Sequence, residues 1–349
     1  MIKILGVELR LLCILVSTLG FLFFGCSTSS NITDSSDQSS SKDSDYSLIY
    51  MIHGDANYLY HDNGEDYNAD EQALQDALEI ARKATSGEVF VFHQKPERKI
   101  LGLLPKKDRV VYHFVNGYLL NKQKYSPADG GFTTEAELYN SLSTANKARS
   151  FFFYFGHEIP TFSTQSYHSS QSNKAFNTDI FSDHLSLFNT YFDLIALSTC
   201  NNGNAKMMAA LSDKADFVIA SPQNLHLSYL SLSKLELLEN DPELETSLLA
   251  DSLAKDSYDK LTSTLQTMVT VGVYDLSKIN DYSSELAENY SDYLEDVSAK
   301  PRFTDNIDCA KIPLLSSTIN SSGVTLYYKS SAFGRKTNQK THSGWGCKE

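Results

Sequence analysis

The stretches SFFFYFGH at residues 150–157 and YFDLIALSTC at residues 191–200 decide the fold. Each is a short, mostly aromatic and aliphatic run that passes directly into polar residues. Such runs are typical of strands buried on both faces of a parallel sheet. The first run ends at His157 and the second at Cys200, so the sequence predicts two core strands with a reactive side chain just past each carboxyl end.

Further apolar runs alternate with helical patterns on both sides of this pair. Strands separated by helices in this order predict an α/β fold, with a mostly parallel sheet and helices on both faces. Asn116-Gly117 is a strong hairpin turn signal between two of the strands. The predicted strands are 47–52, 88–92, 109–115, 118–122, 150–155, 191–197, 216–220 and 324–328. The predicted helices are 70–83, 134–147, 205–211, 243–261 and 276–294.

His157 and Cys200 form a candidate catalytic pair. Right-handed crossovers bring the carboxyl ends of neighbouring parallel strands, roughly 5 Å apart, to one edge of the sheet. A thiol beside an imidazole in a polar, partly exposed site is an effective nucleophile. The alternative is a packing cysteine, because nine histidines make chance pairing easy. The polar turn that follows Cys200 favours an exposed thiol near a helix start, where the helix dipole lowers the thiol pKa.

Length and charge limit the classes of protein that fit. A chain of 349 residues can bury one large core or two modest ones, and 41% hydrophobic content excludes disorder of the whole. The net charge of -13 argues against a nucleic-acid partner, because binding phosphates needs clustered lysines and arginines.

The first 26 residues resemble a secretion signal. Lys3 and Arg10 lie near the start of an apolar run, Leu11–Phe24, and Gly25-Cys26 resembles the lipobox of bacterial lipoproteins. We therefore expect a lipidated Cys26, export from the cytoplasm and anchoring in the cell envelope, at an outer membrane or the cell surface. A transmembrane anchor is the alternative, because the run approaches the ~20 residues that span a bilayer.

The remaining chain divides into three segments by composition. Residues 27–46 are rich in serine and predict a disordered tether. Residues 47–240 form the predicted α/β core, and 241–349 a helical C-terminal region with a late strand. Of five cysteines, Cys309 and Cys347 could close a loop outside the cytoplasm, which would leave Cys200 free.

The order of several motifs resembles the clostripain family of cysteine peptidases, in the clan that also holds gingipains, legumain and caspases. The resemblance covers most of residues 47–328. The motifs are YMIHGDANYLYHD, GGFTTEAELYNSL, FFFYFGHE, DLIALSTCNNG, ADFVIASPQNLHLSYLSL, VTVGVYDLSKINDYSSELAE and SSGVTLYY.

The resemblance implies a caspase-like fold and a role for each site residue. His157 would protonate the leaving amine, and Cys200 would attack the scissile carbonyl. The backbone N–H groups of Cys200 and Glu158 would hold the oxyanion. Water would then hydrolyse the thioester, so the chemistry needs no cofactor. Some members of the family use calcium, although this sequence has no defined metal loop.

Two departures from the family pattern affect specificity and oxyanion binding. Glu158 stands where the family has a glycine, which can take a positive φ without steric cost. Serines stand where clostripain-like members have pocket acids, so the predicted pocket of Ser198, Thr199, Ser228 and Tyr229 has no carboxylate. We therefore predict that strict Arg/Lys specificity is lost, because such a pocket cannot offset the desolvation of a guanidinium. The alternative source of an acid is Asp193 or Asp216.

The sequence thus predicts a membrane-anchored cysteine endopeptidase that acts on peptides or proteins outside the cytoplasm. The alternative is a catalytically inactive caspase-fold lipoprotein that binds peptides or a partner in the cell envelope. A purely structural envelope protein fits less well, because it leaves the paired strand-end histidine and cysteine unexplained.

Overall fold

The computed structural model describes residues 44–54, 59–62, 64–95, 99–100, 104–105, 109–126, 131–143, 147–160, 177–278 and 323–333. The predicted signal peptide, most of the predicted tether, Cys26, Cys309 and Cys347 lie outside these residues. In the part of the chain that is described, no helix is both long and apolar enough to span a bilayer.

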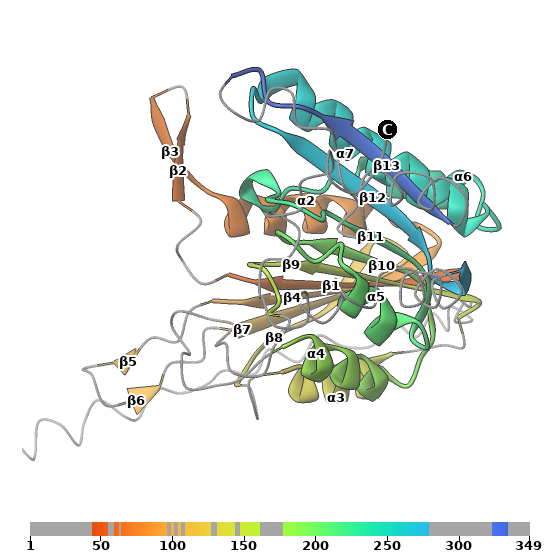
Figure 1. The fold of residues 1–349 in the computed structure, drawn as a ribbon. Coiled ribbons are helices and arrows are strands. Elements are labelled where there is room, and N and C mark those ends of the chain that lie inside the picture. The colour runs from red at the N-terminus through yellow and green to blue at the C-terminus, as the bar shows by residue number, and fades with distance from the viewer. Residues whose placement is uncertain are drawn as a thin grey trace, which may run out of the picture. The chain divides into compact units, whose positions relative to one another are not determined.

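Within the described residues, a nine-stranded sheet organises the fold in the order β13-β12-β11-β10-β9-β1-β4-β7-β8 (Figure 1). The inner strands β4, β1, β9, β10 and β11 run parallel, and antiparallel pairs flank them, β7–β8 beyond β4 and β12–β13 beyond β11. The strands are β1 (Tyr46–His53), β4 (Gly87–Gln94), β7 (Arg109–Val115), β8 (Tyr118–Tyr125), β9 (Arg149–Phe155), β10 (Phe192–Ser198), β11 (Ala215–Ala220), β12 (Val269–Asp275) and β13 (Val324–Lys329).

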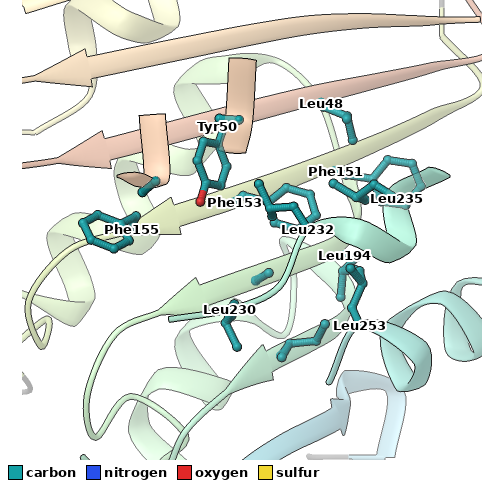
Figure 2. Close-up of a cluster of buried hydrophobic side chains, with 14 of the residues drawn as sticks. Leu48, Tyr50, Phe151, Phe153, Phe155, Leu194, Leu230, Leu232, Leu235 and Leu253 are labelled. Carbon is teal, nitrogen blue, oxygen red and sulfur yellow. The ribbon is translucent and has the colours of Figure 1, made fainter. Parts of the chain in front are cut away.

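The parallel strands are buried on both faces, as their unbroken apolar runs predict. All 8 residues of β1 and all 8 of β4 are buried. Alternate side chains enter two separate cores, because successive residues of a strand point to opposite faces. Leu48 and Tyr50 pack with Phe151 and Phe153 on one face (Figure 2), and Ile49 belongs to the core of the other face.

Helices cover both faces of the sheet (Figure 1). One face packs against α2 (Ala69–Lys83) and α7 (Thr246–Thr264), and the other against α3 (Thr133–Leu142), α4 (Thr178–Leu185) and α5 (Ala205–Leu211). The α2 helix begins where the Asn68 side chain accepts a hydrogen bond from the Asp70 N–H, as expected of an N-cap.

Shorter elements complete the described structure. They are the hairpins β2 (Leu59–Asp62) with β3 (Glu65–Asn68) and β5 (Lys99–Ile100) with β6 (Leu104–Pro105), the helix α6 (Leu237–Asn240), and the 3-10 turns η2 (Ser186–Phe188), η3 (His226–Ser228), η4 (Ser233–Glu236) and η5 (Leu276–Lys278). The sequence reasoning did not predict the two small hairpins.

The predicted α/β fold with a mostly parallel sheet is confirmed. The hairpin turn is confirmed as well, since Asn116 and Gly117 have φ of 51° and 80°, as a type I′ turn requires. The late strand joins the same sheet through β12, so residues beyond 240 extend the core. The edge of the predicted tether is wrong, because Tyr46 is buried and already belongs to β1.

Two predicted helices differ from the structure. The helix predicted over 134–147 ends at Leu142, because Ser143 takes an extended conformation at its C-cap. The helix predicted over 276–294 begins as the short turn η5 at Leu276–Lys278, and its remaining residues lie outside the described ranges.

Candidate active site

The strand tips that carry His157 and Cys200 are neighbours in the sheet. β9 and β10 pair in parallel up to Phe155 opposite Ser198. His157 and Cys200 each follow two residues later, both half-buried. Since paired parallel strands lie about 4.8 Å apart, both side chains leave the sheet at the same place on its carboxyl edge.

The backbone of the loop that contains Leu225 contacts the Cys200 thiol. Its Sγ accepts a hydrogen bond from the Leu225 N–H at 3.3 Å and lies 3.5 Å from the Leu225 carbonyl oxygen. Burial raises the pKa of the thiol above its ordinary value, and the Glu158 carboxylate adds to this effect, whereas the Leu225 backbone opposes it. The expected lowering by a helix dipole is therefore wrong, because α5 begins at Ala205 and the thiol is desolvated.

This raised pKa predicts the pH dependence of thiol chemistry. With no substrate bound, alkylation of Cys200 by iodoacetamide is expected to be slow at pH 7 and to accelerate with pH, because only the thiolate reacts. The half-maximal rate should lie above the ordinary pKa of 9.0. Rates measured by mass spectrometry of the Cys200 peptide between pH 6 and 11 test this. A half-maximal rate well below 9.0 would contradict it.

The loops that follow the two strands are joined by polar side chains. Glu158 Oε2 accepts a hydrogen bond from Asn201 Nδ2 at 2.7 Å. The buried Asn202 side chain bonds the backbone of Ile159 twice, at 2.9 and 2.8 Å. Glu158 is not among the described residues with positive φ, so its backbone does not carry the strain expected when it replaces a glycine.

Three of the four predicted pocket residues line one cavity. Ser198, Ser228 and Tyr229 surround a cavity of about 40 Å³ beside the strand ends, together with Tyr50 of β1. The Ser228 hydroxyl donates to the Gly156 carbonyl at 2.8 Å, and the Ser198 hydroxyl donates to the Ser228 carbonyl. Both serines therefore also tie the strand tips together.

Thr199, the fourth predicted pocket residue, does not line this cavity. It is fully buried, and its hydroxyl donates to Asn202 Oδ1 at 2.6 Å. Thr199 therefore stabilises the loop that follows Cys200. The cavity wall contributed by the η3 loop includes Leu227, and Leu227 and Ser228 take left-handed φ of 51° and 49°.

The cavity contains an acid that the sequence reasoning missed. Asp76 of α2 lines it, and burial, followed by the charge of Glu79, raises the pKa of its carboxyl. The signal was present in the helix pattern, because Ala69, Gln72, Ala73 and Asp76 follow the i, i+3, i+4, i+7 spacing of one helix face. The structure was needed to show that this face of α2 borders the strand tips.

The two acids considered from the sequence lie elsewhere. Asp193 accepts hydrogen bonds from the Ser150 N–H at 2.8 Å and from Arg149 Nε at 3.4 Å, at the start of β9. Asp216 accepts a hydrogen bond from the Tyr191 hydroxyl at 3.1 Å, near the start of β11. Both positions are at the end of the sheet opposite Cys200, so neither acid lines the cavity.

A metal ion needs several ligand side chains that face one another. Nowhere in the described ranges do three or more His, Cys, Asp or Glu side chains converge as a metal ion would require. The calcium binding that the family resemblance allows therefore stays a prediction.

Three solved structures of cysteine proteases are similar in fold to this chain. A secreted C11 cysteine protease from Bacteroides thetaiotaomicron, iotapain, is similar with a TM-score of 0.52 and 10% identity over 70% of each chain. The same organism's secreted C11 protease in complex with an irreversible peptide inhibitor gives 0.51 and 14%, over 70% of this chain and 69% of that one. An inactive zymogen C11 protease from Parabacteroides distasonis gives 0.50 and 14%, over 70% and 65%.

The sequence itself matches no protein-family model and no curated protein. At 10% and 14% identity the three likenesses concern the fold, which is that of the C11, or clostripain-family, cysteine proteases. The caspase-like fold predicted from the motifs is thereby confirmed.

Proposed function

We propose that this chain is a cysteine endopeptidase that hydrolyses peptide bonds with Cys200 and His157. The parallel register of β9 and β10 is the observation that supports this most, since it brings the two side chains to adjacent strand tips. A C11-type fold around that pair favours peptide hydrolysis over other thiol chemistry.

The proposed reaction proceeds through a thioester. His157 accepts the proton of the Cys200 thiol as the sulfur attacks the scissile carbonyl carbon, and backbone N–H groups of Cys200 and Glu158 stabilise the oxyanion. The C–N bond breaks as His157 gives a proton to the leaving amine. A water molecule then attacks the thioester and gives a proton to His157. The C–S bond breaks, His157 passes that proton to the Cys200 sulfur, and the acid product leaves with the thiol restored. Each step balances without a cofactor.

We propose that the cavity gives no strict preference for arginine or lysine before the cut bond. Asp76 is the carboxylate that lines it, and it is half-exposed. Lys260 lowers the Asp76 pKa electrostatically, so a positive charge already lies near the carboxylate. One half-exposed and partly compensated carboxylate attracts a cationic side chain only weakly.

Asp76→Asn should therefore reduce cleavage after Lys or Arg by about twofold to fivefold relative to cleavage after norleucine. Cleavage rates of peptides that differ only at that position test this. Glu71→Gln is the matched control, because Glu71 lies on the same helix but outside the cavity and is exposed. A strict Arg or Lys requirement in the wild type, or an unchanged ratio in Asp76→Asn, would contradict this assignment.

We further propose that the enzyme acts outside the cytoplasm, held at a membrane by a lipid on Cys26. Support comes from the sequence, where a charged start and an apolar run precede Gly25-Cys26 and a serine-rich segment follows. Metabolic labelling with a clickable palmitate analogue, lost in Cys26→Ala, tests the anchor. Its natural substrates would be peptides or proteins of that compartment, with no nucleic-acid partner.

An inactive peptide-binding lipoprotein is the second candidate, and one observation favours it. Burial of the Cys200 thiol and the nearby Glu158 carboxylate both disfavour the thiolate, whereas the hydrogen bond from the Leu225 N–H favours it. Incubation of the full chain with a mixed peptide library, with products mapped by mass spectrometry, separates the candidates. Cleavage that a thiol-directed irreversible inhibitor blocks supports the peptidase, and binding without cleavage supports the alternative.

A further inference from the structure

His157 and Cys200 both lie beyond the paired part of β9 and β10, at the carboxyl edge of the sheet. At the carboxyl edge, the Gly156 N–H after β9 donates a hydrogen bond to the Ser198 carbonyl oxygen at the end of β10, at 3.3 Å. Beyond this bond the chains leave the sheet, and strand pairing no longer fixes the distance between them. The relative positions of His157 and Cys200 therefore depend on contacts between the two loops.

Two consecutive asparagines supply contacts of this kind. Asn202 bonds the Ile159 backbone twice, and Asn201 Nδ2 donates to Glu158 Oε2 at 2.7 Å. We propose that Glu158 is a positioning residue, which through Asn201 holds the loop of the nucleophile against the loop of His157. This inference rests on the proposed function, because that function gives the two loops their roles.

The backbone of Asn201 explains why its side chain needs a fixed partner. Its φ is 56°, in the left-handed region that non-glycine residues rarely occupy and asparagine tolerates best. Its N–H donates to the Gln223 carbonyl at 3.0 Å. Its side-chain oxygen is buried and makes no hydrogen bond to the described residues, so the amide is held through its nitrogen, by Glu158 and, at 3.4 Å, by Asn224 Oδ1.

Position and charge of Glu158 have opposite effects on the proposed reaction. The hydrogen bond orients the segment that follows Cys200, whereas the negative charge, together with burial, raises the thiol pKa. Substitutions can separate the two effects. Glu158→Gln keeps an acceptor oxygen for Asn201 and removes the charge, while Glu158→Ala removes both.

The test compares kcat and KM of full-chain variants on one cleaved peptide. Glu158→Ala should lower kcat by about tenfold to a hundredfold, as small misplacements of reacting groups do, with KM nearly unchanged. Glu158→Gln should keep a kcat at least about fivefold above that of Glu158→Ala, because it keeps the acceptor oxygen for Asn201. Asn201→Gly, which keeps the left-handed backbone, should match Glu158→Ala, and the double variant should lose no more. Asp183→Asn, an exposed carboxyl on α4, is the control and should behave as wild type.

Several results would overturn the proposal. They are a wild-type kcat in Glu158→Ala, an equal loss in Glu158→Gln, or additive losses in the double variant. Wild-type protein that cleaves no peptide would instead contradict the proposed function. Alkylation by iodoacetamide then still tests the placement of Glu158, since Glu158→Gln should react about twofold or more faster at pH 7. Equal alkylation rates would overturn the inference independently of peptidase activity.

Discussion

Replacement of Cys200 by alanine is expected to lower kcat for peptide cleavage by at least about a thousandfold, with no acyl-enzyme thioester formed at position 200. The sulfur is the atom that forms the thioester in the proposed reaction, and no other described cysteine is available to take its place. Binding of the peptide should persist, because the cavity is formed by side chains other than Cys200. Fluorescence anisotropy of a labelled peptide and a discontinuous cleavage assay measure the two properties separately.

His157→Ala should cause a loss of the same order, and the double variant with Cys200→Ala should lose little more, since the two groups act in one step. His61→Gln is the matched control, because His61 lies on the exposed β2 hairpin, paired with Asp66. Circular dichroism must show that every variant is folded. Cleavage that survives Cys200→Ala in folded protein would contradict the catalytic assignment, and unaltered activity in His157→Ala would remove the histidine from it.

The sequence was sufficient to predict the two strands that carry His157 and Cys200, but it did not predict which residues contact the Cys200 thiol. Buried parallel strands have unbroken apolar sequences, so the strands that end at Phe155 and Ser198 could be identified by inspection. These two strands could be predicted to be neighbours, because consecutive parallel strands usually lie side by side and are joined by right-handed crossovers. The environment of the thiol depends instead on Leu225, which is 25 residues away in sequence and lies in an irregular loop.

The same contrast applies to the acids near the site. Sequence periodicity placed Asp193 and Asp216 on strands correctly, but their distance from the cavity depends on which end of each strand they occupy. Asp76 comes from a helix that precedes the catalytic strands by about 70 residues in sequence, and it reaches the cavity only because α2 packs across β1. Local patterns carry no information on such long-range packing.

A large loss of folding stability is expected on replacement of Glu88, near the start of β4. Its side chain is fully buried in β4 and accepts hydrogen bonds from His113 at 2.7 Å, from Ser143 at 3.2 Å and from Lys147. Glu88→Gln would leave the buried ammonium of Lys147 without its counter-charge. Breaking a buried ion pair in this way costs about 3–5 kcal/mol of unfolding free energy, so the Tm should fall by at least about 6 °C.

The pH dependence of stability gives this assignment a second, independent test. Burial by itself raises the pKa of Glu88, but the hydrogen bonds and charges of His113 and Lys147 outweigh it and lower the pKa from 4.5 to about 2. A carboxyl with a depressed folded-state pKa stabilises the fold fully above its unfolded value and loses that contribution as protons bind. The difference in unfolding free energy between wild type and Glu88→Gln should therefore narrow as pH falls from about 4.5 towards 2.

Denaturant titrations at several pH values measure that difference directly, with Glu79→Gln as the control. Glu79 pairs with Lys83 on the exposed face of α2 and should change neither the Tm nor its pH dependence appreciably. A Glu88→Gln protein as stable as wild type at pH 7 would show that the buried pair contributes nothing to the stability of the fold. A difference that stayed constant down to pH 2 would show that Glu88 is not the group that titrates, and the acid sensitivity of the protein would then have to come from its other carboxyls.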